Sequence, residues 1–574
     1  MNAFFHKSIR LAAVIGLAFL ATTCTQEARE DILDGYTEGI SLNIDTDIFL
    51  TPVSLYFRDA NPESNVEEID GLRITVEGPD KGLLYSTDGS RDLEPVFGIL
   101  EVALDKATAI SPDDPLEFTV VAQAPGYIKT VQNIVLYDTT FQFVPVNMVN
   151  LNDPPEGVSI EAGTTAADAG GVVEETVFTT SMPAGKEEDA SVKLNQGTKV
   201  MNADGEELIG DIEVQLVHFD NRTETSLEAF PGGFSVTNAL DENGNAMEPF
   251  EFITAGFVAL DMFVGNDEVT DFSEPVEVEV GINPQTIDPN SGQPVAEGDI
   301  IPYWSLDDNT GQWRREGEAV VTKNADGTLS ATMEITHLSW WNFDYRVNVC
   351  TRNEPVRLFF ESFWHTPSIT PRFRAELHEL QSNFNAPRRP FGRIWVRPYD
   401  GEEVYFYNIP KGRTFRLELY YGWWLVYTSQ YFTTTCGSTT TIDLNDFFPL
   451  DNIEISAEFS GICEGTSGAD VVIQPTAIIL YRPSQSRRYF SYLGRIESGK
   501  FWTDELVENE TYDFFVIVGR KRFFFPNTKI SSQVIEVEDY RMEIEIVDTE
   551  AGERRCDIVV KDFVIPDEYC DLFN

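Results

Sequence analysis

Cysteine and histidine are the residue types in this chain that could most readily carry chemistry, and both are few. The cysteines beyond Cys24 lie at positions 350, 436, 463, 556 and 570. Four of them form two similar spans, Cys350 to Cys436 and Cys463 to Cys556, which indicates two consecutive modules, each closed by one disulfide. Disulfides persist mainly in proteins outside the cytoplasm. Connectivity cannot be deduced from sequence, and one cysteine is left over.

One histidine precedes a possible nucleophile. His337 is followed two positions later by Ser339, and an imidazole suits the role of general base near neutral pH. His378 is followed by Glu379, but the second histidine of a zinc-protease motif is missing. The chain also lacks a Gly-x-Ser-x-Gly elbow, a phosphate-binding loop and a dinucleotide fingerprint. We therefore predict no enzyme active site; a reaction of the chain on itself is the exception considered below.

Asp-rich turns such as Asp307-Asp308-Asn309 could hold Ca²⁺ weakly through their oxygen atoms. None of them matches the twelve-residue calcium loop, and tight hairpin turns use the same residues. The sequence therefore predicts no metal site and no cofactor.

The N-terminus predicts export. Basic residues (His6, Lys7, Arg10) precede the apolar stretch from Leu11 to Leu20, which is too short to span a bilayer. Ala21-Thr22-Thr23-Cys24 follows and resembles the lipobox of bacterial lipoproteins, although that family prefers Leu where Ala21 stands and a smaller residue at Thr23. The resemblance implies a signal peptide over residues 1–23, a lipid on Cys24 and a polar tether over 24–40. Ordinary signal cleavage nearby, which would leave a free thiol, is the alternative.

The residues after Cys24 indicate the final location. Thr25 stands where an Asp would retain a lipoprotein at the inner membrane, and the acidic run Glu27, Glu30, Asp31 resembles surface-export signals of Bacteroidetes lipoproteins. We therefore predict a surface-exposed protein that is anchored in the outer membrane through the lipid on Cys24. Its expected partner is an unknown protein or glycan.

The charge is strongly negative and unevenly distributed. Residues 24–345 contain 14 Lys and Arg against 61 Asp and Glu, whereas residues 346–574 contain 25 against 34. The net charge of −54 would repel the phosphates of nucleic acids, which excludes nucleic-acid binding. The less acidic C-terminal part is the expected partner-binding end, with residues 41–346 acting as a stalk.

Strict alternation of apolar and charged residues predicts β-strands nearly throughout. Pro275–Ile282 places valines on one face and Glu277 and Glu279 on the other, and Leu72–Val76 and Met542–Ile546 repeat the pattern. Turn signals such as Asp400-Gly401 separate the strands. The pattern is typical of tandem Ig-like β-sandwiches, so we predict an all-β chain. Composition places the units at residues 41–150, 158–346, 347–448 and 449–574.

Two units resemble known families. Phe118-Thr119-Val120-Val121-Ala122 with Ala124-Pro125-Gly126-Tyr127 resembles carboxypeptidase regulatory-like domains, which pack or bind and lack catalytic residues. Asp308-Asn309-Thr310-Gly311-Gln312-Trp313 and the closing segment Thr336–Asp344 resemble the ZU-type sandwich of netrin receptors and the GAIN domain of adhesion receptors.

Some members of the ZU and GAIN families cleave themselves at a His-Phe-Ser or His-Leu-Ser tripeptide, which His337-Leu338-Ser339 matches. The resemblance implies that Ser339 attacks the Leu338 carbonyl while His337 takes the hydroxyl proton; water then hydrolyses the resulting ester. Many relatives keep the tripeptide only for packing, so a structural role stays open.

An aromatic run around Tyr421, Trp423 and Trp424 is the candidate binding patch, because exposed rings can stack on sugars or anchor a protein partner. Alternation would turn about half of these rings into a core. The sequence therefore predicts a non-enzymatic surface scaffold or adhesin-like module. A carbohydrate-binding lipoprotein of a glycan-uptake system and a self-cleaving surface protein are the alternatives.

Overall fold

The structure is a computed structural model that describes residues 41–564, apart from 46–48, 88, 182–187, 367–369, 381–389, 448–451, 464–469, 475, 487–488, 508, 519–520, 531–541 and 549–553. The described chain is almost entirely β-strand, with one short helix, α3 (Glu224–Glu228), and one 3-10 turn, η1 (Lys81–Leu83). The predicted all-β class is confirmed. Within the described residues, no helix is long and apolar enough to cross a membrane.

Module 1 is a sandwich of two three-stranded sheets, with the orders β4-β2-β7 and β3-β5-β6. Its strands are β2 (Leu50–Asp59), β3 (Arg73–Glu77), β4 (Ile99–Leu104), β5 (Leu116–Gln123), β6 (Thr130–Leu136) and β7 (Gln142–Met148). Alternate apolar residues such as Leu55, Val102, Phe118 and Ile134 form its core between the two sheets.

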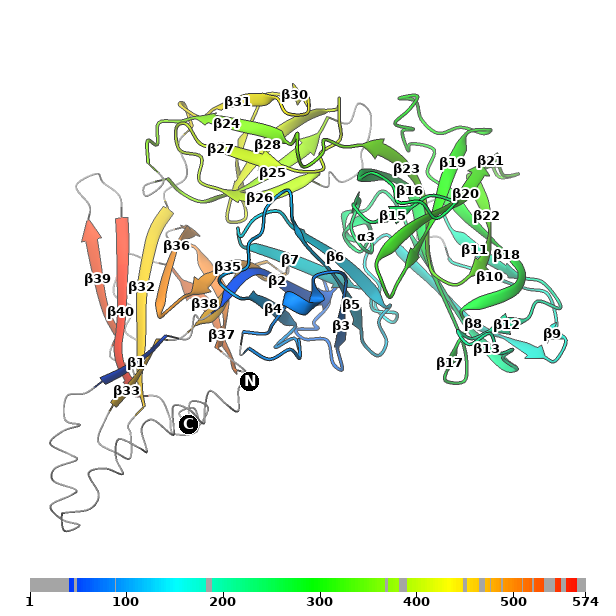
Figure 1. The fold of residues 1–574 in the computed structure, drawn as a ribbon, viewed down its shortest axis with the longest axis horizontal. Helices are drawn as coiled ribbons and strands as arrows, with labels where there is room; N and C mark the ends of the chain where they lie inside the picture. The colour runs from blue at the N-terminus through cyan, green and yellow to red at the C-terminus, as the bar shows by residue number, and fades with distance from the viewer. Residues whose placement is uncertain are drawn as a thin grey trace, which may run out of the picture.

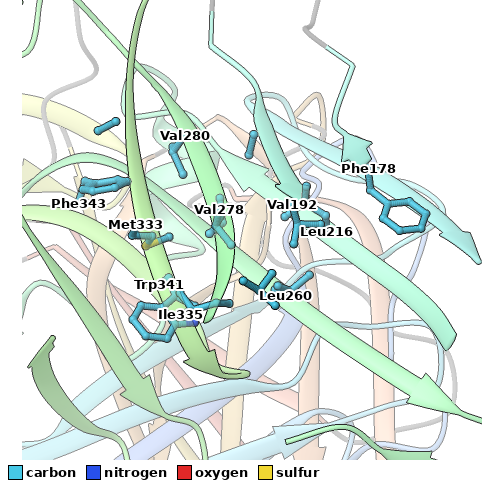
Figure 2. Packing of buried hydrophobic residues seen from close by; sticks show 14 of the residues in the cluster. Phe178, Val192, Leu216, Leu260, Val278, Val280, Met333, Ile335, Trp341 and Phe343 are labelled. Atoms are coloured by element: carbon cyan, nitrogen blue, oxygen red, sulfur yellow. The ribbon is translucent and has the colours of Figure 1, made fainter. Parts of the chain in front are cut away.

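Module 2 is the largest sandwich and contains a six-stranded and a ten-stranded sheet. Its strands are β8 (Val158–Asp168), β9 (Gly171–Val172), β10 (Thr176–Thr179), β11 (Ala190–Leu194), β12 (Val200–Met201), β13 (Gly210–Phe219), β14 (Ser235–Val236), β15 (Ala239–Leu240), β16 (Phe250–Val264), β17 (Asp267–Glu268), β18 (Asp271–Ile282), β19 (Ile300–Asp307), β20 (Gln312–Val320), β21 (Thr322–Lys323), β22 (Leu329–His337) and β23 (Trp340–Asn348). Along β18, Val276, Val278 and Val280 are buried while Glu277 and Glu279 are exposed, as alternation predicts. Figure 2 shows Val278 and Val280 in the cluster that also contains Leu260 and Trp341.

Module 3 contains the sheets β27-β24-β31 and β26-β25-β28-β29, and β30 pairs with β28. Its strands are β24 (Val356–Glu361), β25 (Phe373–Glu379), β26 (Gly392–Val396), β27 (Glu403–Phe406), β28 (Thr414–Tyr421), β29 (Trp424–Thr428), β30 (Phe432–Thr433) and β31 (Thr439–Asp443).

Module 4 pairs the sheet β35-β34-β37-β38 with a sheet that contains β1, β33, β32, β40, β39 and β36. Its strands are β1 (Ser41–Asp45), β32 (Asn452–Cys463), β33 (Asp470–Gln474), β34 (Ala477–Pro483), β35 (Ser491–Ile496), β36 (Lys500–Val507), β37 (Thr511–Val518), β38 (Lys521–Lys529), β39 (Met542–Asp548) and β40 (Arg554–Val564).

Modules 1, 3 and 4 share one pattern of strand pairing. In each, the first long strand pairs in parallel with the last and antiparallel with a middle strand: β2 with β7 and β4, β24 with β31 and β27, β32 with β40 and β36. In the second sheet, β5, β28 and β37 carry β6, β29 and β38 on their outer side. We call β6, β29 and β38 the flank strands.

The chain does not extend as a linear stalk. β1, the first described strand, pairs in parallel with β33 and so belongs to the last module. Modules 1 and 4 also share an apolar cluster in which Tyr56 and Ile99 of module 1 meet Leu480 and Phe515 of module 4. Figure 1 shows module 1 between modules 2 and 4, with module 3 across one side. The expectation that residues 41–346 form a stalk and the later modules a separate outer end is therefore wrong.

Candidate functional site

The His337-Leu338-Ser339 tripeptide forms the turn by which the chain passes from one sheet of module 2 to the other. β22 ends at His337 and β23 begins at Trp340. The Leu338 amide donates a hydrogen bond to the Thr270 carbonyl oxygen at 2.8 Å, and all three residues of the tripeptide are half-buried. The turn is therefore held on both sides by neighbouring strands.

The side chains of the tripeptide point to different partners. The His337 ring lies against Trp341, with ring centroids 4.9 Å apart. The Ser339 hydroxyl donates to the carbonyl oxygen of Leu306 at the end of β19. The described residues with left-handed backbone do not include Leu338 or Ser339. This geometry fits a packing role, because it ties the β22–β23 turn to β19, and the self-cleavage hypothesis stays a prediction.

The two tryptophans that follow the tripeptide face opposite ways. Trp341 is buried in the core of module 2, as Figure 2 shows. Trp340 joins a second apolar cluster that includes Val131 and Val149 of module 1, and its Nε1 donates to the Lys129 carbonyl oxygen at 3.3 Å. The closing segment of module 2 thus forms part of the contact with module 1.

The Asp307-Asp308-Asn309 turn, considered for Ca²⁺, also lies at this contact. Asp307 accepts the backbone N–H groups of Asn309 and Thr310 at 2.9 and 3.1 Å. Asp308 pairs with Lys129 at 2.9 Å, and Asn309 accepts a hydrogen bond from the same ammonium group at 2.8 Å. Over the described part of the chain, the structure contains no group of three His, Cys, Asp or Glu residues that could hold a metal ion.

Gly311 ends the turn and allows module 1 to approach closely. Its carbonyl oxygen accepts from Asn133 Nδ2 at 2.9 Å. With φ at +68°, it occupies the region that favours glycine, and an added Cβ would lie 2.2 Å from Asn133 Oδ1. The Asp-rich turn of module 2 is therefore a docking turn between modules.

The predicted aromatic patch is not a free binding surface. Tyr421 is fully buried in the core of module 3. Trp423 and Trp424 are half-buried and pack on module 4, where their ring centroids lie 6.4 Å from Tyr481 and 6.5 Å from Tyr512. The prediction is wrong because the hairpin that carries these rings is the contact between two modules, which the sequence of module 3 alone does not reveal.

A buried charge network on the outer face of module 3 was missed by the sequence analysis. Glu376 on β25 accepts from Arg393 Nε at 2.7 Å and lies 3.0 Å from His378 Nε2, which is 3.4 Å from Glu418 on β28. Burial alone would raise the pKa of Glu376, but Arg393, the His378 hydrogen bond and Arg374 lower it to about 2. The alternation of Arg374, Glu376 and His378 was the available signal, since it places three polar side chains on one face.

A second pair of carboxyls lies where module 4 meets module 3. Asp504 accepts the backbone N–H of Arg372 at 3.0 Å, and Glu505 lies 3.3 Å from the Tyr481 hydroxyl. Burial raises the pKa of Asp504 to about 7 and that of Glu505 to about 8, although Arg372 opposes both shifts. This pair was not predicted from the sequence, because charged residues such as those of β36 are common on the solvent face of a strand.

The cysteine predictions have different outcomes. The Cys350–Cys436 disulfide is confirmed, with Cα atoms 5.1 Å apart. The Cys463–Cys556 pairing is wrong, because the β32–β40 register places Cys556 opposite Ile455, eight residues before Cys463. Eight residues of strand span roughly 26 Å, whereas a disulfide needs Cα atoms about 4.4–6.8 Å apart. Cys24 and residues 1–40, with the predicted signal peptide and tether, lie outside the described residues.

Comparisons with known proteins do not place the chain in a family. No protein-family model matches it, and no curated protein matches it. A solved structure that matches is the major pilin subunit of Bacillus cereus, at 9% identity and a TM-score of 0.12 over 68% of this chain and 98% of the pilin. A TM-score this low carries no argument about function.

Proposed function

We propose that this protein is a non-enzymatic, lipid-anchored component of the cell envelope that acts as a scaffold or adhesin-like binding module. The observation that carries the proposal is that charged and aromatic side chains, which could otherwise bind a ligand, lie at contacts between modules. The Asp308–Lys129 ion pair and the rings of Trp340, Trp423 and Trp424 all lie at such contacts. Residues that would be candidates for catalysis or ligand binding thus hold four sandwiches together, as a scaffold requires.

The anchor is proposed from the N-terminal sequence, and the position of β1 supports it. The tether from residue 24 to Ser41 leads into module 4, which packs on module 1. A lipid on Cys24 would therefore hold both modules near the membrane. The test is Cys24→Ser in the native host, with Cys463→Ser as a matched control. We expect the first variant to leave the membrane fraction and the second to stay, and retention of both would contradict the anchor.

Glycan binding is the second candidate, favoured by exposed rings on module 3. Tyr431 is 42% exposed beside Arg416, which pairs with Glu418, and Tyr405 is 40% exposed beside Glu403. An aromatic face next to charged hydrogen-bonding groups suits a sugar ring. A glycan panel on purified protein tests this, with Tyr431→Ala as the variant. Binding that Tyr431→Ala abolishes would favour glycan uptake over scaffolding.

Self-cleavage at Leu338–Ser339 is tested separately on a denaturing gel of the purified mature protein. Because Ser339 donates to the Leu306 carbonyl oxygen, we expect one full-length band that hydroxylamine does not change. Two fragments in the wild type, restored to one band by Ser339→Ala, would establish the cleavage instead.

A further inference from the structure

Two of the three flank strands dock onto a neighbouring module. On module 1, the carbonyl oxygen of Val131 in β6 accepts the backbone N–H of Gly232 of module 2 at 2.7 Å. Asn133 of the same strand donates to the Gly311 carbonyl oxygen. Lys129, immediately before β6, pairs with Asp308 of the acidic docking turn. The edge of β6 is thus covered by backbone groups and an acidic side chain of another module.

The flank strand of module 3 docks at its turn. Trp424, the first residue of β29, packs edge-to-face on Tyr512 of module 4. Gly422 in the preceding turn has φ at +55°, and an added Cβ would lie 2.8 Å from the Tyr481 hydroxyl and 3.0 Å from the Glu505 carbonyl oxygen. The flank strand β29 of module 3 thus contacts module 4, just as the flank strand β6 of module 1 contacts module 2.

The flank strand of module 4 is β38, and among the described residues it pairs with β37 alone. β38 ends the sheet order β35-β34-β37-β38. Phe523, Phe524 and Phe525 are 43%, 45% and 49% exposed, and they are the exposed phenylalanines of the described chain. Phe524 leans on Phe515, with centroids 4.8 Å apart, while its two neighbours alternate to the other face. The outer edge of β38, on which no other described strand pairs, is therefore apolar on both faces.

We propose that β38 is the docking edge for an acidic, extended segment of a partner protein, which adds to the sheet as a further strand. The part of β38 that precedes Pro526, residues 521–525, offers backbone N–H and C=O groups at its outer edge to such a segment. Apolar side chains on both faces suit an added strand, whose own side chains also alternate. The proposal deepens the binding function proposed above and rests on it, but it does not depend on the lipid anchor.

Charge complementarity selects an acidic partner. β38 contains Lys521, Arg522 and Lys529 and no acidic residue, in a chain with 41 basic and 95 acidic residues. Arg522 is held by Glu67 of module 1 at 3.2 Å, and Lys529 is exposed. The pairing of Lys129 with Asp308 beside β6 is the intramolecular counterpart of the contact proposed here.

Two other occupants fit less well. A second copy of β38 would bring together two strands that contain basic residues and no acidic ones, and like charges across a strand pair are destabilising. A lipid membrane could contact only one face of the sheet at β38. The three phenylalanines alternate between both faces, so a membrane would leave part of the apolar surface uncovered.

The test is a titration of the purified full-length protein with a fluorescent octapeptide of alternating Val and Glu, followed by anisotropy. An octapeptide of alternating Val and Lys is the matched probe. We expect the acidic peptide to bind at least tenfold more tightly than the basic one, with binding weakened at least fivefold by Lys529→Glu and by Phe525→Glu. Lys411→Glu, an exposed lysine of module 3, is the control and should bind as the wild type does.

Three outcomes would overturn the proposal. The first is equal binding of both peptides, or acidic-peptide binding that neither β38 variant changes. The second is binding to anionic vesicles, or a dimer in sedimentation, that Phe525→Glu abolishes while the acidic peptide does not bind. The third is full hydrogen-exchange protection of β38 in the free monomer, because the edge would then already be filled. None of these outcomes bears on Cys24→Ser fractionation, so the anchor and the docking edge can fail separately.

Discussion

Modules 3 and 4 have the same strand pairing, but the outer face of the second sheet is charged in module 3 and apolar in module 4. The outer face of module 3 carries the charge network of Glu376, His378 and Glu418. The corresponding face of module 4 carries Leu480 and Phe515, which pack on module 1. One fold therefore supports two kinds of outer face, since the core residues set the fold and the outward positions of the same strands are free to differ.

The difference extends to the carboxyl groups. Against the effect of burial, Arg393, the hydrogen bond with His378 and Arg374 lower the pKa of Glu376 in module 3 to about 2, whereas burial raises that of Glu505 in module 4 to about 8. A buried carboxyl stays ionised only where its neighbours offset the lost hydration. The two modules should therefore respond to pH in opposite directions.

The largest expected effect comes from removing the Cys350–Cys436 disulfide of module 3. In module 4, the β32–β40 register keeps Cys463 and Cys556 too far apart to form such a bond. We expect Cys350→Ser with Cys436→Ser to lower the stability of module 3 by about 4 kcal/mol, because the bridge closes a long loop. Calorimetry with and without reductant measures this. Cys463→Ser is the control, and an equal loss in that variant would contradict the asymmetry.

Truncation of the apolar outer face should come next. Leu480 is 2% exposed between modules 1 and 4, so Leu480→Ala should cost about 3 kcal/mol. Chemical denaturation measures the loss, and Leu425→Ala, at a position 48% exposed, is the matched control. A similar midpoint for both variants would show that module 1 does not cover this face.

Glu376→Gln should destabilise module 3 by about 2 kcal/mol at pH 7, because it removes the buried carboxylate that pairs with Arg393 and Arg374. Since the folded pKa lies below the unfolded one, the stability from this carboxylate is present above about pH 4 and lost as the pH falls toward 2. The deficit of the variant should therefore shrink between these values. A pH-independent deficit would argue that the loss comes from packing alone.

Glu505→Gln should have the smallest effect and the opposite sign. The folded pKa lies above the unfolded one, so the folded state is favoured at low pH and weakened as the pH rises from about 4 to about 8. The variant should be more stable than the wild type by about 1–2 kcal/mol at pH 8.5, and the gain should vanish near pH 4. Thermal melts across this range measure it, and a variant less stable at pH 8.5 would refute the buried-acid interpretation.

The strands were predictable from local alternation, whereas the contacts between modules were not. The burial of the valines of β18 could be predicted from residue spacing. Spacing also suggests the pair Cys350–Cys436, but similar spacing gives the wrong pairing for Cys463 and Cys556. The burial of Trp423 and Trp424 could not be predicted, because an aromatic hairpin looks the same whether it meets solvent or another module. The parallel pairing of β1 with β33 also escaped prediction, since the two strands lie far apart in sequence.

The place of β1 in module 4 has a consequence for how the chain matures. β1, the first strand of the described chain, pairs with β33 near the other end of the sequence, so the sheet that contains both cannot close until most of the chain has been synthesised. Such late closure slows folding and leaves strand edges open in the meantime. The high negative charge of residues 24–345 would make partly folded segments repel one another and so oppose their aggregation. The charge of this molecule would then protect it while it folds.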